Sequence, residues 1–179
     1  YNSGVPADLS SYSPVGWWRM GDGTGDTDSG SGAPASGDTI GTVVNQGSAS
    51  SSDATGTNGA LYSDDIPVFN TYSVDFDGTD DYMDLGTTSA LNPTSSLTVS
   101  AWVKADSHTN TSGVYDSIYS SSKDSGGANG GFVLVNNLNK WKCYFYSGTT
   151  WYAVESDNNV VDGQWYHLAS TWDGTTAKL

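Results

Sequence analysis

The residues most suited to chemistry lie in an acidic turn between positions 74 and 84. Its run, VDFDGTDDYMD, gathers five aspartates around an Asp-Gly pair: Asp75, Asp77, Asp80, Asp81 and Asp84. Calcium takes about six to eight oxygen ligands from carboxylates, carbonyls and water, so the loop predicts a calcium site. Its spacing differs from that of an EF-hand. The alternative is that Asp77 and Asp80 cap the turn through side-chain hydrogen bonds to the backbone.

A second acidic group lies near the start of the chain. Asp22, Asp26 and Asp28 stand within a glycine-rich run that follows the segment VGWWRM. Clustered carboxylates in such a loop also fit calcium. The candidate calcium ligands are therefore Asp22, Asp26, Asp77, Asp80 and Asp81.

Aromatic residues gather around a predicted hairpin whose turn is Ser147-Gly148. Sites that bind sugars combine rings, which stack on sugar C–H groups, with a few polar side chains. The candidate carbohydrate-binding residues are Trp141, Tyr144, Tyr146, Trp151 and Tyr152. Alternation along the strand places Tyr144 and Tyr146 opposite Cys143 and Phe145. The alternative is that the rings replace aliphatic residues in the core, because only 36% of the chain is hydrophobic.

Catalytic patterns are not found. Glycosidases use two carboxylates that flank the scissile bond, but the chain has a single glutamate, Glu155. Asp75 and Asp77 share a strand face and could in principle replace it, but the family resemblance described below implies that they belong to a turn rather than to a catalytic cleft. There is no nucleophile elbow, and zinc is not indicated because the cysteine and the two histidines, His108 and His167, are far apart. We therefore expect a protein that is not an enzyme.

The charge of the chain narrows the choice of partner. The net charge is −14 at pH 7, from six basic and twenty acidic residues. Phosphate binding needs basic patches, so nucleic acid and anionic membrane are not expected. The acidity favours cations and solubility, and solvation alone is the alternative reason for it. No apolar run approaches the ~20 residues that span a bilayer, so no membrane insertion is expected.

Short strands with a two-residue period position these side chains. No stretch of eleven residues has a helical period, and turn signals separate the apolar runs, which predicts an antiparallel sandwich. Residues 21–38 and 46–59 are expected to be loops, and Cys143 to be a small core residue. The predicted strands are Val15–Met20, Thr39–Asn45, the two arms of the acidic turn, Leu97–Lys104, Phe132–Val135, Trp141–Tyr146, Thr149–Val154, Trp165–Trp172 and Thr176–Leu179.

Three blocks of this pattern resemble a known family. The laminin-G-like, concanavalin-A-like jelly rolls contain segments similar to FDGTDDYMDLG, LTVSAWVK and GQWYHLASTWDGTTAKL. The segment with which these domains usually begin resembles VGWWRMGDGTG together with VNQGSASSSDATGTNGAL. The resemblance implies an all-β, antiparallel two-sheet jelly-roll sandwich. It also implies a packing role for His167 and adds weight to calcium binding near the acidic turns.

The resemblance also suggests how the module is bounded. The family's domain continues with further strands, so residues 15–179 are expected to be a jelly roll whose C-terminal strands are missing. Tyr1-Asn2-Ser3-Gly4 is similar to the family's closing motif. Residues 1–14 are therefore expected to be the tail and linker of a preceding module, in a tandem array of a phage or bacterial surface protein.

We expect a non-enzymatic adhesion or carbohydrate-binding module of an extracellular, cell-surface or virion-associated protein. Its expected partners are a glycan or a surface protein, together with neighbouring modules or subunits. One alternative is a structural or assembly module of a phage fibre, capsid decoration or surface filament with no small ligand. A glycoside hydrolase is the remote alternative.

Overall fold

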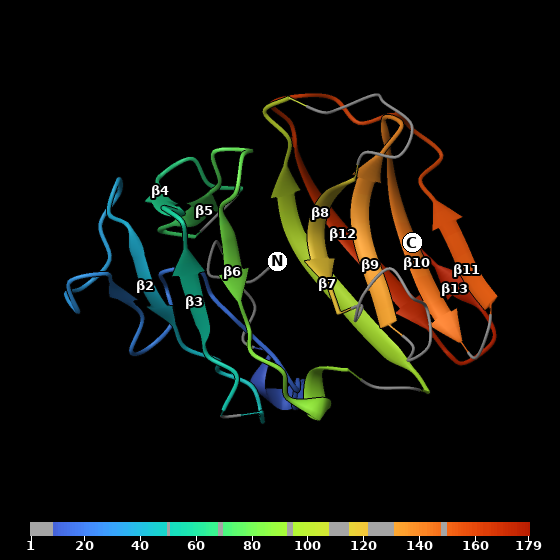
Figure 1. Ribbon diagram of the computed structural model, residues 1–179, viewed down its shortest axis with the longest axis horizontal. Helices are drawn as coiled ribbons and strands as arrows, with labels where there is room; N and C mark the ends of the chain where they lie inside the picture. The colour runs from blue at the N-terminus through green and yellow to red at the C-terminus, as the bar shows by residue number, and fades with distance from the viewer. Residues whose placement is uncertain are drawn as a thin grey trace. The chain divides into compact units, whose positions relative to one another are not determined.

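The structure is a computed structural model that describes residues 9–49, 51–67, 70–92, 95–107, 115–121, 131–147 and 150–179. It divides into two compact units, Tyr1–Leu91 and Asn92–Leu179 (Figure 1). Most of the predicted linker, residues 1–8, lies outside the described residues, as do His108 and the turn residue Gly148.

The first unit holds two antiparallel sheets, one with the order β1-β2-β3-β6 and one that pairs β4 with β5. The elements are η1 (Ser10–Tyr12), β1 (Thr27–Asp28), β2 (Ile40–Val43), β3 (Ala54–Thr57), β4 (Leu61–Ser63), β5 (Ser73–Asp75), β6 (Tyr82–Asp84) and η2 (Ser89–Leu91).

The core of the first unit is small, and side chains from both sheets contribute to it. Its buried members are Ile40, Val43, Ala54, Ala60 and Tyr62. β3 reaches this core with small residues, because a Cβ at Gly56 would stand only 2.7 Å from the Cβ of Ile40. Close strand approach thus replaces side-chain bulk here.

The predicted strand Val15–Met20 is wrong. An asparagine side chain takes the place of a strand partner: the N–H of Trp17 donates to Asn45 Oδ1 (2.8 Å). Asn45 Nδ2 in turn donates to the carbonyls of Val15 (3.3 Å) and Ala49 (2.7 Å). Side-chain amides of this kind compete with regular pairing by satisfying the backbone groups directly.

The loops predicted over 21–38 and 46–59 are also wrong in part, since they contain β1 and β3. β3 has little hydrophobic signal, but its residues pair with β2 on one side and β6 on the other. Two neighbours therefore fix this strand, not its own composition.

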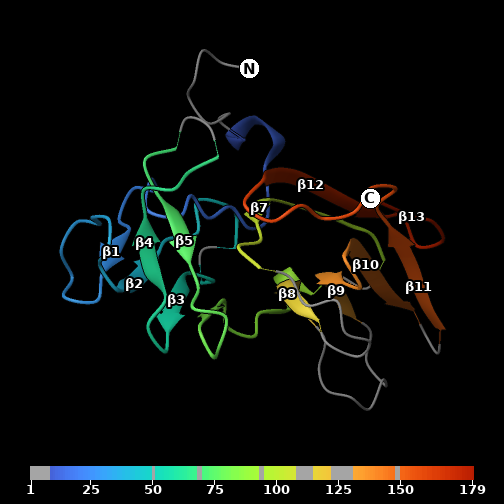
Figure 2. The same cartoon turned by 90° about the horizontal axis from the view of Figure 1, so that it is seen from above.

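The second unit is a sandwich of two antiparallel sheets, with the orders β11-β10-β9-β8 and β13-β12-β7. The two layers are visible in Figures 1 and 2. The strands are β7 (Leu97–Lys104), β8 (Asp116–Ser120), β9 (Gly131–Asn137), β10 (Lys140–Ser147), β11 (Thr150–Glu155), β12 (Trp165–Trp172) and β13 (Ala177–Lys178).

The core of the second unit lies between these sheets and is largely aromatic. Its buried members are Phe132, Leu134, Trp141, Cys143, Phe145, Val160, Leu168 and Trp172. Phe145 stacks on Phe132 (6.1 Å between ring centroids) and on Trp172 (5.4 Å). Cys143 is buried as predicted, and burial raises the pKa of its thiol to about 11, against a hydrogen bond from Ser170 that lowers it.

The predicted fold class is confirmed. Every strand pair among the described residues is antiparallel. β7 alternates half-buried and exposed residues over Leu97–Trp102, and β12 buries Leu168, Ser170 and Trp172 on one face, as the sequence predicts. In the part of the chain that the structure describes, no helix has the length and apolar character needed to cross a membrane.

Candidate functional site

The first candidate site is the outer face of the β10–β11 hairpin, on the side away from the core. Strand alternation sends Trp141, Cys143 and Phe145 inward, so the residues between them point outward. The register then places three outward pairs across the two strands: Lys142 opposite Glu155, Tyr144 opposite Ala153 and Tyr146 opposite Trp151. These six residues are called the outer face below.

Aromatic rings cover one end of the outer face. Trp151 is 48% exposed. Its ring lies 4.9 Å from that of Tyr146, and it meets Tyr144 edge-on at 6.4 Å. The ring of Tyr144 also meets edge-on the ring of Tyr115, the residue just before β8, with 6.2 Å between the ring centroids. The rings thus form a connected aromatic surface, part of which is open to solvent.

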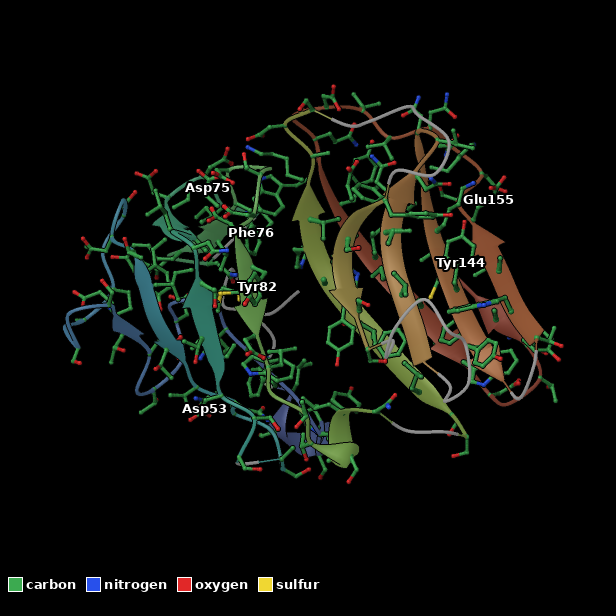
Figure 3. The ribbon with its side chains drawn as sticks, viewed as in Figure 1. Asp53, Asp75, Phe76, Tyr82, Tyr144 and Glu155 are labelled. Carbon is green, nitrogen blue, oxygen red and sulfur yellow. The ribbon has the colours of Figure 1, made fainter. Side chains whose placement is uncertain are left out.

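An ion pair closes the other end. Lys142 Nζ lies 3.1 Å from Glu155 Oε2, with side chains 14% and 58% exposed respectively. Between this pair and the rings stands Ala153, the smallest side chain of the outer face. A hollow of about 210 Å³ opens there, lined by Lys142, Tyr144, Ala153, Val154 and Glu155. Figure 3 labels Tyr144 and Glu155 on this sheet.

The Tyr144 hydroxyl is protonated at neutral pH, since the ordinary pKa of tyrosine is about 10. Burial raises the pKa of Tyr144 above its ordinary value, the positive charge of Lys142 lowers it, and Tyr115 and Glu155 raise it further. A protonated phenol can both donate and accept a hydrogen bond. The hollow therefore combines a ring edge, a hydroxyl, an ammonium and a carboxylate.

Two of the predicted sugar-binding rings do not belong to the outer face. Trp141 is only 4% exposed and meets Tyr166 edge-on in the core. Tyr152 stands opposite Phe145, on the core side of the edge strand, and its ring lies 4.8 Å from Trp172. The buried ring of Trp141 cannot stack on a sugar. Tyr152 is 38% exposed but lies on the other side of β11 from Trp151, so Tyr144, Tyr146 and Trp151 are the candidates on the outer face.

The second candidate site is the acidic loop, defined by Asp77, Asp80 and Asp81. Their carboxylate oxygens lie within 4.8 Å of one another. Among the described residues, these three form the group of acidic, histidine or cysteine side chains that is close enough to share one metal ion. The cluster could hold a metal ion. Asp77 Oδ1 accepts the N–H of Thr79 (2.7 Å), and Asp81 Oδ2 accepts the N–H of Asp77 (3.0 Å).

The loop therefore has the side-chain-to-backbone hydrogen bonds of a capped turn and also the clustered carboxylates of a possible metal site. The capping aspartates are Asp77 and Asp81, whereas the sequence indicated Asp77 and Asp80. One carboxylate oxygen of Asp77 and one of Asp81 take part in these two bonds, which leaves the others for a cation. Gly78 has a φ of 74°, which an Asp-Gly turn of this shape requires.

Asp26 has a structural role. It is 7% exposed, its Oδ2 accepts the N–H groups of Gly21 and Gly23 (2.9 Å each), and its Oδ1 accepts that of Val44 (2.7 Å). Asp22 Oδ2 accepts the N–H of Thr71 (2.9 Å). Within the described ranges these two aspartates do not join a third acidic residue at ligand distance.

Comparison with known protein families gives a match over residues 77–179 to the family described as "Concanavalin A-like lectin/glucanases superfamily". The chain belongs to this superfamily. Comparisons with curated proteins and with solved structures give no match.

The concanavalin A-like region includes both candidate sites. It begins at Asp77, the first aspartate of the acidic loop, and contains the whole outer face. Asp22 and Asp26 lie before it. The superfamily assignment therefore covers the residues whose geometry fits a site and leaves out the pair whose geometry is structural.

Sequence reasoning missed the polar half of the outer face. Lys142 was not considered, and Glu155 was weighed only as a catalytic group. The signal was present, because a tight hairpin that pairs Tyr146 with Trp151 also pairs Lys142 with Glu155 four residues further along.

Proposed function

We propose that the chain is a non-enzymatic carbohydrate-binding or adhesion module of an extracellular, cell-surface or virion-associated protein. The observation that carries the proposal is the outer face itself. Exposed rings stand beside a small hollow whose far wall is a Lys–Glu pair. Rings stack on the C–H faces of sugars while polar groups bind their hydroxyls, and sites with this composition are typical of small polar ligands.

Membership of the superfamily supports a sugar as the ligand and leaves open whether the protein binds the sugar or cleaves it. Its name covers lectins, which bind sugars, and glucanases, which cleave them. Glycosidases need two carboxylates at a defined separation. The only glutamate of the chain, Glu155, has an ammonium 3.1 Å away as its partner on the outer face. A carboxylate held in this way suits hydroxyl binding better than acid catalysis.

Calcium at the acidic loop is the metal part of the proposal. Carboxylate and carbonyl oxygens are the ligands that calcium prefers. Asp77, Asp80 and Asp81 supply three carboxylates, and the hydrogen bonds inside the loop hold two of them in position. When bound, the ion would neutralise part of the repulsion within a loop of a chain whose net charge is −14.

A glycan array with the whole chain tests the proposed binding. Trp151→Ala should abolish the signal, since it removes the most exposed ring of the outer face. Trp102→Ala is the matched control: Trp102 is 44% exposed on the outer side of β7, where its ring lies 5.2 Å from that of His167. Equal losses in the two variants, or no glycan signal from the parent chain, would contradict the proposal.

Calcium is tested by calorimetric titration after chelation. Heat is expected from the parent chain, with clearly weaker binding in Asp80→Asn, which removes one of the three negative charges around the ion and breaks none of the loop's two capping bonds. Asp64→Asn, an exposed aspartate of the same unit, should titrate like the parent. A parent chain that gives no heat and no change in melting temperature excludes calcium.

An assembly role is the second proposal, and the exposed Trp102–His167 pair favours it. An exposed aromatic pair on a sheet face suits a protein neighbour, such as another module of a tandem array or a second subunit. Mass photometry at micromolar concentration tests this role. A monomer in the parent chain, unchanged by Trp102→Ala, would argue against it.

A further inference from the structure

We propose that the hollow above Ala153 is a subsite for one neutral pyranose residue, whose adjacent hydroxyls are bound between Lys142 and Glu155. This inference rests on the proposed carbohydrate-binding function and names the ligand class of the same site.

The size of the hollow favours a single sugar ring. Its volume is about 210 Å³, below the about 300–1,000 Å³ of pockets that enclose drug-sized ligands. It exists because Ala153 stands in a row where the neighbouring side chains are long. Tyr144 lies directly opposite Ala153, and Lys142 and Glu155 form the next row. A larger residue at 153 would fill the space.

The polar wall offers complementary groups at a fixed spacing. Lys142 Nζ and Glu155 Oε2 lie 3.1 Å apart. An ammonium only donates hydrogen bonds and an ionised carboxylate only accepts them. One hydroxyl of a sugar can accept from Lys142 while its neighbour donates to Glu155, and such charge-assisted bonds are stronger than neutral ones. Adjacent hydroxyls on a pyranose ring present this combination.

The charges select a neutral ligand over an acidic one. Lys142 is the more buried partner, and its charge is already balanced by Glu155, which is 58% exposed at the rim. A uronate or sulfate would have to displace Glu155 from Lys142 and then lie beside a free carboxylate. The net charge of −14 adds a general repulsion of anions.

The remaining wall completes the subsite. Tyr144 lines the hollow, and its phenol is protonated at neutral pH because the ordinary pKa of tyrosine is about 10. Its hydroxyl adds a third polar contact, and the Tyr146–Trp151 rings lie at the adjoining end of the outer face. The subsite thus binds one residue of a glycan, and the rings provide a surface for the next residue.

Isothermal titration calorimetry with defined probes tests the subsite. The probes are tetrasaccharides of glucose, galactose and mannose, with tetragalacturonate as the acidic counterpart. Ala153→Phe fills the hollow from an exposed position, and Glu155→Gln keeps the shape while removing the charged acceptor. Ala169→Phe is the matched control, since Ala169 is exposed on β12 of the other sheet. Circular dichroism checks that each variant is folded.

The parent chain is expected to bind a neutral probe and not tetragalacturonate. Loss of a bond to a charged group should weaken neutral binding about tenfold in Glu155→Gln. Ala153→Phe should abolish binding and Ala169→Phe should leave it unchanged. If Trp151→Ala abolishes neutral binding while both hollow variants bind normally, the subsite is refuted and the proposed function stands. Preference for tetragalacturonate, strengthened by Glu155→Gln, refutes the neutral ligand. Binding of no probe, joined to a blank array, refutes both proposals.

Discussion

Substitution of Asp26 by asparagine should destabilise the first unit strongly, and the reason is geometric. Asp26 binds three backbone N–H groups through both of its carboxylate oxygens, from a position that is 7% exposed. These bonds join the turn at Gly21 and Gly23 to Val44, at the end of β2. Asparagine keeps the size of the side chain but has one acceptor oxygen. Its NH₂ group would face at least one of the three donors.

The expected loss follows from counting those bonds. A hydrogen bond to a charged group contributes about 1.5–3 kcal/mol, and a buried donor left without a partner costs about 1–3 kcal/mol. The Asp26→Asn variant must lose one such bond, orphan its donor and weaken the others, so the loss should be about 3 kcal/mol. For a unit of this size, about 1 kcal/mol shifts the melting temperature by roughly 4–8 °C. The expected shift is therefore roughly 15 °C.

A resonance inside the same unit can report this loss. The indole N–H of Trp18 donates to the carbonyl of Ser52 (2.9 Å), so its NMR signal follows unfolding of the first unit in urea. Asp22→Asn is the matched control, with the same charge change but a single, exposed bond to Thr71. It should cost less than about 1 kcal/mol. Equal losses in the two variants would refute the structural assignment of Asp26. A loss that needs calcium would return both residues to the list of metal ligands.

Three further predictions concern single side chains. Cys143, whose thiol pKa burial raises to about 11, should resist iodoacetamide at pH 8 in the native state and react fully in denaturant, as read by mass spectrometry. Gly56→Ala should lower the free energy of unfolding by about 2 kcal/mol in urea titrations, because its Cβ would stand 2.7 Å from that of Ile40. Backbone N–H groups of Thr176 and Thr175 lower the pKa of Asp173 below 3.8, so its stabilising bonds are complete above that pH and are lost as the pH falls through the lowered pKa. Asp173→Asn should therefore melt below the parent at pH 7, and the difference should shrink below pH 3.8.

The strands that carry their own hydrophobic period were predictable. Leu97–Lys104 and Trp165–Trp172 have the predicted bounds, because each turns one set of alternate residues toward the core, half-buried in β7 and mostly buried in β12. β8 escaped prediction, since its register shifts between Ser117 and Tyr119 and the irregularity breaks the two-residue period. β3 escaped because Ala54 and Gly56 reach the core by close backbone approach.

The features of the candidate site that follow from strand alternation were predictable from the sequence. Tyr144 and Tyr146 face outward as expected, and the same parity already places Trp141 with Cys143 in the core. The pairing within the acidic loop could not be predicted. The bond from the Asp77 N–H to Asp81 spans four residues, whereas common side-chain turns close over two. Only the folded loop selects Asp81 over Asp80 as the capping residue.

Stabilisation of the sheet is the strongest competing explanation for the outer face. Tyr146 and Trp151 are directly opposite, and a cross-strand aromatic pair contributes about 0.2–1 kcal/mol without any ligand. Sheet stability, however, gives no reason for the smallest side chain at Ala153, where a β-branched residue would pack on Tyr144 and fit the strand better.

Ala153→Val therefore separates the two explanations. If the outer face binds a sugar, the variant should unfold at higher urea concentration than the parent, by up to about 1 kcal/mol, and should bind the neutral tetrasaccharide more weakly. The two effects have opposite signs because valine adds packing where the ligand needs space. A variant that is more stable and binds as well as the parent would show that the hollow is incidental to binding. A variant that is less stable would show that Ala153 is required by the sheet itself.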